Sequence, residues 1–114
     1  MGVYTTDGKD TGVTAIKNAA THAALYNTAG SELTGGTPAY ARKAITWGTV
    51  ASGAVALTGT PVSFDVPAGA DVKTIRYCDA AGTTIYGMET LATAESYASQ
   101  GVFELTAGSM TITD

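Results

Sequence analysis

The sequence predicts an all-β protein, a β-sandwich or jelly-roll-like fold of roughly six to eight short antiparallel strands with one short N-terminal helix. Two observations predict this class. Beyond residue 37, apolar and polar side chains alternate over short segments, which is the period of a strand with one buried face. Glycine, proline and aspartate separate these segments at close intervals, as turns do in sandwiches and small barrels.

The chain of 114 residues fits one domain, residues 1–114, with a single core. Residues 1–9 are expected to form an extended N-terminal arm. Asp10 or Thr11 then caps a short helix, because either side chain accepts a hydrogen bond from a free amide of the first turn. Apolar residues follow at helical spacing, at Val13, Ile16 and Ala20.

Strands are expected over most of the remaining chain, and the clearest pattern is the alternation VSFDV at residues 62–66. A turn at residues 79–82 is expected to join two strands as a hairpin. Residues 27–36 form a long loop, and residues 91–100 fit a helical turn as well as a strand. The expected strands cover residues 25–26, 39–47, 54–57, 62–66, 72–78, 83–88, 102–106 and 110–113.

The strand over residues 39–47 carries the only tryptophan and two adjacent basic residues. Ile45 and Trp47 indicate its buried face. Arg42 and Lys43 point to opposite faces, because successive side chains of a strand alternate. Solvation or a salt bridge between subunits is therefore favoured for this pair over contact with phosphate.

Charge and composition argue against several classes of partner. The net charge is −4 with only 6 lysines and arginines, whereas duplex binding needs clustered cations, so we expect no nucleic-acid partner. No apolar run approaches the roughly 20 residues that span a bilayer, so we expect no membrane partner. The N-terminus has no secretory leader pattern, and the single Cys78 leaves no intrachain disulfide, which fits a protein made in the cytoplasm.

The residue types that usually carry catalysis form no recognisable constellation. His22, at the end of the expected helix, has no cysteine or carboxylate at metal-ligand spacing, so packing is its expected role. Cys78 lies in mid-strand and is expected to be inert. No serine lies in a G-x-S-x-G context, and no phosphate-binding loop is present. We therefore expect no enzyme activity, no catalytic residue, no metal and no cofactor.

The sequence contains, in order, GVYTTDGK at residues 2–9, GSELTGGTPAYARKAITW at 30–47, VSFDVPAG at 62–69 and GVFELTAGSMTI at 101–112. This order, with a short alanine-rich helix after the first motif, resembles the small tail-fibre-like or minor tail virion proteins of tailed phages of actinobacteria. The resemblance spans nearly the whole chain. Relatives often carry a longer Asp-Pro-Gly-containing loop after the first strand, so no role tied to that loop is carried over.

Similar small β-domains also serve as capsid decorations, so the resemblance implies a virion structural protein and leaves tail and capsid open. It implies a non-enzymatic protein, made in the host bacterial cytoplasm and located in the virion. The expected partners are further copies of the chain, in a homo-oligomer, and phage capsid or tail proteins. A neighbouring subunit can cover an unpaired sheet edge by adding a strand. The candidate interface comprises Val3, Tyr4, Thr5, Glu32, Tyr40, Arg42 and Lys43.

Two alternatives stay open. The first is a carbohydrate-binding module at the tail tip that recognises the host, in which Trp47 stacks on sugar rings together with Tyr40 or Tyr97. Exposure of Trp47 separates the two interpretations, because a buried indole leaves no stacking platform. The second alternative is a small hydrolase whose activity depends on His22.

Overall fold

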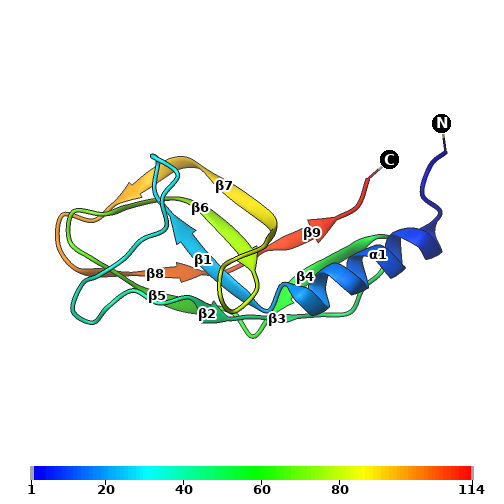
Figure 1. Ribbon diagram of the computed structural model, residues 1–114, viewed down its shortest axis with the longest axis horizontal. Coiled ribbons are helices and arrows are strands. Elements are labelled where there is room, and N and C mark those ends of the chain that lie inside the picture. The colour runs from blue at the N-terminus through cyan, green and yellow to red at the C-terminus, as the bar shows by residue number, and fades with distance from the viewer. Residues whose placement is uncertain (1, 114) are drawn as a thin grey trace.

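The computed structural model describes residues 2–113, which form antiparallel β-sheets with one N-terminal helix, as the sequence predicts. Within that range no sheet closes into a barrel (Figure 1). The helix α1 spans Thr6–Ala19. The strands are β1 (His22–Tyr26), β2 (Lys43–Ala44), β3 (Thr46–Trp47), β4 (Ala54–Thr58), β5 (Val62–Val66), β6 (Asp71–Cys78), β7 (Ile85–Ser96), β8 (Gly101–Leu105) and β9 (Ser109–Thr111).

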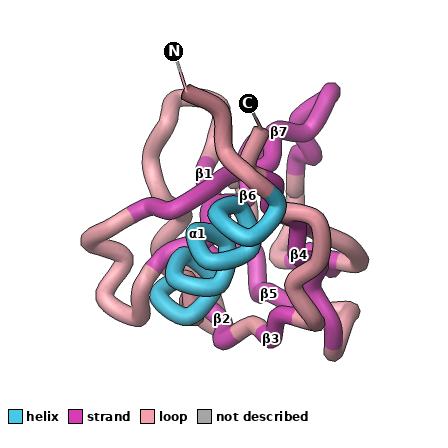
Figure 2. Tube along the Cα trace, turned by 90° about the vertical axis from the view of Figure 1, so that its right-hand side faces the viewer, coloured by secondary structure: helices cyan, strands magenta, loops and turns pink. Residues whose placement is uncertain are grey.

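The strands form three sheets in an elongated body of 48 × 27 × 23 Å. At one end, the four-stranded sheet β2-β1-β6-β7 packs against the two-stranded sheet β5-β8. At the other end, α1 lies against β4 of the three-stranded sheet β3-β4-β9 (Figure 1). Figure 2 looks along the long axis and shows the helix in front of the strands. The fold is therefore a small sandwich extended by a helix-covered sheet.

The core lies between the two packed sheets and is built from alternate strand positions. Leu25 of β1 and the β6 residues Ile75 and Tyr77 are buried on the inner face of the larger sheet. The opposite sheet contributes Phe64, Val66, Phe103 and Leu105. Burying an apolar side chain of this size stabilises the fold by about 2 kcal/mol. The two-residue period in the sequence is the pattern of this inner face.

The helix begins earlier than the sequence predicts. Thr5, not Asp10 or Thr11, is the N-cap, and its Oγ1 accepts a hydrogen bond from the Gly8 amide at 3.1 Å. Asp7 lies in the first turn, where a negative charge favours the helix dipole. The expected arm of residues 1–9 is therefore too long: residues 2–5 precede the helix, and Met1 lies outside the described residues. 

His22 does not end the helix, because α1 is capped at Ala20 and His22 is the first residue of β1.

The segment at residues 39–47 is not one strand. Lys43–Ala44 pair with β1, whereas Thr46–Trp47 pair with β4 in another sheet. Ile45 lies between them, and its amide donates to the Thr21 carbonyl at 3.0 Å. The chain thus crosses between sheets at this point. This division gives nine strands among residues 2–113, one more than expected.

The ambiguous residues 91–96 belong to β7, which pairs with β6. The register shifts between Val72 and Thr74, because Val72 pairs with Glu95 while Thr74 pairs with Thr90. The β7 backbone therefore bulges away from β6 between these pairs. Lys73 stabilises the bulge, since its Nζ donates to the Leu91 carbonyl at 2.7 Å.

Candidate functional site

Three of the residues predicted to form an interface, Glu32, Tyr40 and Arg42, contact one another within the chain. Tyr40 donates its hydroxyl hydrogen to Glu32 Oε2 at 2.8 Å and accepts from the Leu25 amide at 2.9 Å. Arg42 Nη2 lies 2.7 Å from Glu32 Oε1. Burial raises the pKa of Tyr40 well above its ordinary value, so the phenol stays protonated. This network holds the loop between β1 and β2, and Lys43 follows it in β2.

The other predicted interface residues lie ahead of α1, at the opposite end of the long axis (Figure 1). Val3 is 72% and Tyr4 59% exposed. Thr5 is occupied as the helix cap. The structure therefore does not bring the N-terminal residues and the β1–β2 loop together. Whether either group contacts a partner stays a prediction.

The sandwich is open along one side, which sequence reasoning missed. Among the described strands, β7 pairs only with β6, β8 only with β5, and β9 only with β4. Residues of β7 line hollows together with residues 102–112, so β7 lies beside β8 and β9 without a shared ladder of backbone hydrogen bonds. We call the gap between β7 and residues 101–112 the open seam. Unpaired edges of this kind are surfaces to which another strand can add.

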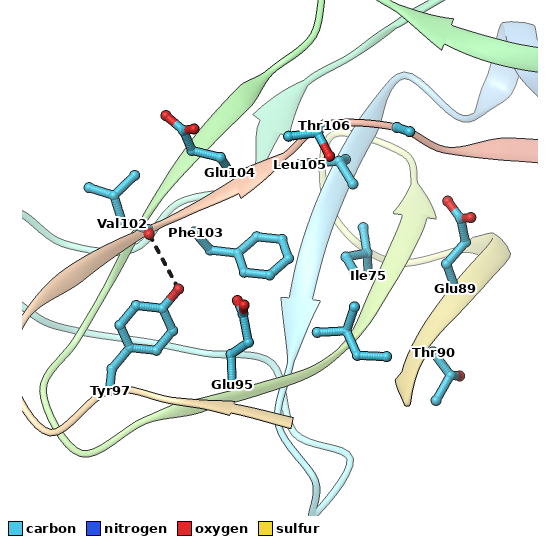
Figure 3. A pocket seen from close by; sticks show the side chains of 12 residues that line it. Ile75, Glu89, Thr90, Glu95, Tyr97, Val102, Phe103, Glu104, Leu105 and Thr106 are labelled. Atoms are coloured by element: carbon cyan, nitrogen blue, oxygen red, sulfur yellow. Dashed lines mark hydrogen bonds between the residues drawn. The ribbon is translucent and has the colours of Figure 1, made fainter. Parts of the chain in front are cut away.

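One half of the open seam is the acidic groove between β7 and β8, with a cavity volume of about 720 Å³. Its apolar lining comes from Ile75, Leu91, Phe103 and Leu105, and its carboxylates from Glu89, Glu95 and Glu104. Figure 3 shows Phe103 directed toward Ile75, with Glu95 between the strands and Glu104 on the outer side of β8. The Tyr97 hydroxyl donates to the Val102 carbonyl at 3.2 Å and links the two strands at one end (Figure 3).

The other half is the apolar groove, a cavity of about 250 Å³ between α1, β7 and β9. No charged side chain is among the residues that line it. Tyr86 and Met88 of β7 are 37% and 53% exposed at this groove. The remaining apolar side chains are those of Val13, Ile16, Met110 and Ile112. Exposed apolar side chains gathered beside a hollow are a feature of surfaces that partners bind.

A part-buried polar pair joins β6 and β7 between the two grooves. The hydroxyl of the fully buried Tyr77 donates to Glu89 Oε2, and the Ser109 amide donates to the same carboxylate. Burial raises the pKa of Glu89 from its ordinary value, while the Ser109 amide lowers it. Gly108 lies beside this pair, and a Cβ there would collide with the Tyr77 hydroxyl. The pair therefore fixes β9 against β7 where the grooves meet.

Trp47 is half-buried and engaged in the core. Its Nε1 donates to the Ala20 carbonyl at 2.8 Å, and its ring packs edge to face on Tyr77 with 5.0 Å between centroids. The hydroxyl of Tyr40, one of the two tyrosines proposed as sugar contacts beside Trp47, is used within the β1–β2 loop network, and that of the second, Tyr97, donates to the Val102 carbonyl. These contacts give each of the three aromatic residues a structural role in the chain.

The single histidine and the single cysteine lie opposite each other on neighbouring strands, because His22 of β1 pairs with Cys78 of β6. His22 Nδ1 lies 2.9 Å from Thr21 Oγ1. Cys78 is buried, and burial raises the pKa of its thiol, which leaves less thiolate at neutral pH. Within residues 2–113, no cluster of three or more histidine, cysteine or carboxylate side chains is arranged to hold a metal ion.

Across those same residues, no helix has the length and apolar character needed to cross a membrane. Comparisons with protein-family models, with curated proteins and with solved structures found no match. The candidate site is therefore described from the residues of this chain alone. One signal for the apolar groove is present in the sequence: Tyr86 and Met88 place apolar side chains on the face of β7 opposite Ile85, so that strand has apolar side chains on both faces.

Proposed function

We propose that this chain is a non-enzymatic structural subunit of a tailed-phage particle, acting through contacts with further copies of itself and with capsid or tail proteins. The observation that carries the proposal is the open seam, which leaves β7, β8 and β9 each with an unpaired edge beside a hollow. The exposed apolar side chains ahead of α1 add a second surface suited to contact. A subunit in an assembly covers such surfaces with its neighbours.

The physical argument is one of exposed backbone and apolar surface. A strand edge has amides and carbonyls that another strand can pair with, and an apolar hollow gains free energy when a partner displaces water from it. Symmetric assemblies engage many copies at once, so each single contact can be weak. An elongated body with surfaces at several points along its length suits this mode of action.

The phage particle enters the proposal through the sequence resemblance. Its most specific part, residues 32–47, contains the Glu32, Tyr40 and Arg42 network that holds the β1–β2 loop. A role for that motif in building the subunit is compatible with either the tail or the capsid, and the proposal covers both.

The test is quantitative mass spectrometry of purified particles from the phage whose genome encodes this chain. We expect the chain at a fixed ratio to the major capsid protein, retained after the particles are washed in high salt. A non-structural protein of the same phage, released by the same wash, is the control. Absence of the chain from washed particles contradicts the proposal.

A further inference from the structure

We propose that the acidic groove receives an extended segment of another protein, in which apolar side chains alternate with lysine or arginine. The segment pairs with the edge of β8 and adds a strand to the sheet β5-β8. This inference rests on the proposed function and deepens it, because it gives the chemistry of a partner and the surface of the subunit that binds it.

The two packed sheets differ in width, and the narrower one ends at β8. The larger sheet has four strands, whereas the sheet that packs on it has only β5 and β8. Because β5 lies close to β2, on the far side of the larger sheet, the part left uncovered is at β7. β7 has 12 residues and none is buried, whereas five of the eight residues of β6 are buried. The smaller sheet is therefore too narrow to cover the inner face of β7.

The edge of β8 at the groove has backbone groups that can pair with an incoming strand. The Val102 carbonyl points to this side, because it accepts the Tyr97 hydroxyl hydrogen at 3.2 Å (Figure 3). In an antiparallel pair, residues that bond to the partner strand alternate with residues whose backbone groups point away from it. Glu104 therefore directs its amide and carbonyl to the same side as Val102. Tyr97 occupies one end of the groove, so an incoming strand would pair along the backbone from Glu104 to Thr106.

The lining of the groove determines which apolar side chains the segment needs. Phe103 points inward from β8, whereas Val102 and Glu104 lie on its outer side (Figure 3). A strand beside β8 has the same two faces, because side chains of neighbouring strands lie opposite one another. Inward apolar side chains would cover Ile75 and Leu91 of the lining. An outward apolar side chain would cover Val102, which is 52% exposed.

Charge complementarity selects a basic segment. Three carboxylates line the groove, and no lysine or arginine does. Glu89 is already held by the Tyr77 hydroxyl and the Ser109 amide. Glu95 and Glu104 are exposed, and a strand beside β8 would cover them. Covering carboxylates without a counter-charge is costly, whereas a lysine or arginine opposite Glu104 forms a favourable pair across the strands.

A second copy of this chain does not offer such a segment among residues 2–113. Its six lysines and arginines all lie within the fold: two in α1, one in β2, two in β6, and Arg42 in an ion pair with Glu32. The segment ahead of α1, residues 2–5, has no charged side chain. Two copies with a net charge of −4 also repel one another. The occupant is therefore a protein of different sequence.

The first experiment measures the binding of two synthetic peptides to the purified chain by fluorescence anisotropy. In one peptide of about six residues, an ordinary strand length, valine alternates with lysine, and in the control each lysine is replaced by glutamate. We expect saturable binding of the lysine peptide and none of the glutamate peptide. Glu95→Gln with Glu104→Gln should raise the dissociation constant about tenfold. Asp7→Asn with Asp10→Asn removes the same charge from α1 and should leave it unchanged.

Hydrogen exchange distinguishes strand addition from loose attraction between opposite charges. With the lysine peptide bound, the amides of Glu104 and Thr106 should exchange about fivefold more slowly, because they donate to the added strand. The Thr111 amide of β9 lies at the apolar groove and should exchange at its original rate.

A third measurement tests the alternative occupant by analytical ultracentrifugation of the chain without peptide. Self-association that disappears in the chain carrying Glu95→Gln and Glu104→Gln would place a second copy in the groove and overturn the inference. Equal binding of the two peptides, equal binding by wild type and that variant, or unchanged exchange at Glu104 and Thr106 also overturns it.

Competition during infection separates this inference from the proposed function. Wild type should enter particles about fivefold better than the chain carrying Glu95→Gln and Glu104→Gln, and equally well as the chain carrying Asp7→Asn and Asp10→Asn. Equal incorporation of all three removes the groove contact and keeps the proposed function. A chain that binds the lysine peptide but is absent from washed particles removes the proposed function and keeps the groove as a binding site.

Discussion

Gly108 shows how a single residue sets the geometry of the seam. It is half-buried beside the Tyr77–Glu89 pair, and a Cβ built there lies 2.6 Å from Glu89 Oε2 and 2.8 Å from Leu57 Cδ1. It also meets the Tyr77 hydroxyl. The absence of a side chain is therefore what allows β9 to approach β7.

Gly108→Ala should lower the free energy of unfolding by about 2 kcal/mol, because the new methyl group overpacks a site already filled by the side chains of Tyr77, Glu89 and Leu57. Urea denaturation measures the change. Adding Tyr77→Phe should recover part of the loss, since it removes one of the colliding atoms. Gly2→Ala, where nothing lies within 4 Å of a Cβ, is the control. Equal stability of Gly108→Ala and wild type would show that the site has room.

Glu89 should make stability depend on pH in a defined direction. Burial raises the pKa of Glu89 in the folded chain, whereas the pKa of a glutamate in an unfolded chain is about 4.3. Between those two values the folded state binds more protons than the unfolded state. The Glu89 contribution to stability therefore grows as pH falls through this window and is lost as pH rises.

Glu89→Gln lacks this titration, so the stability of wild type relative to the variant should increase from about pH 7 to about pH 4 in urea denaturation. Glu104→Gln removes an exposed carboxylate from the next strand and controls for the change in net charge. A stability difference that is constant over this range, or that shrinks toward acid, contradicts the assignment.

At the scale of elements, α1 depends on its cap. Thr5→Ala should destabilise the chain by about 1 kcal/mol, because it removes the acceptor of the Gly8 amide. Thr6→Ala, at the first exposed helical residue, should change stability by less than about 0.5 kcal/mol. Thermal unfolding followed by circular dichroism compares the two. Equal effects of both substitutions would argue against Thr5 as the cap.

The elements that the sequence predicted well are those whose signal is local. The alternation at residues 62–66 and 72–78 corresponds closely to β5 and β6, because one face of each strand is buried in the core. The division at Ile45 was not predictable, since it depends on β1 and β4, two partners far away in sequence. The helix start was missed because threonine is a common residue and its capping role depends on the conformation that it adopts.

At the scale of the whole molecule, the fold class follows from periodicity but the open seam does not. The seam is a missing pairing between β7 and residues 101–112, and no residue pattern marks which strand edges remain unpaired. The sequence did indicate Val3 and Tyr4 as surface residues by their place in a short N-terminal segment, and both are exposed. The contact network of Glu32, Tyr40 and Arg42 required the three-dimensional structure to be found.

Deleting residues 2–4 keeps the Thr5 cap and every residue of the core, so the shortened chain should retain the wild-type unfolding temperature. Its circular dichroism spectrum should also match that of wild type. A clear loss of thermal stability would mean that these residues contribute to the fold of their own chain.

The most direct test of an assembly role measures how well this shortened chain enters particles. Full-length and shortened chains are co-expressed during infection, and mass spectrometry of washed particles gives their ratio relative to the ratio in the cell. We predict that the full-length chain is enriched at least about tenfold, the effect of losing about 1.4 kcal/mol of contact free energy. Equal incorporation of the two chains would contradict an assembly contact made by residues 2–4.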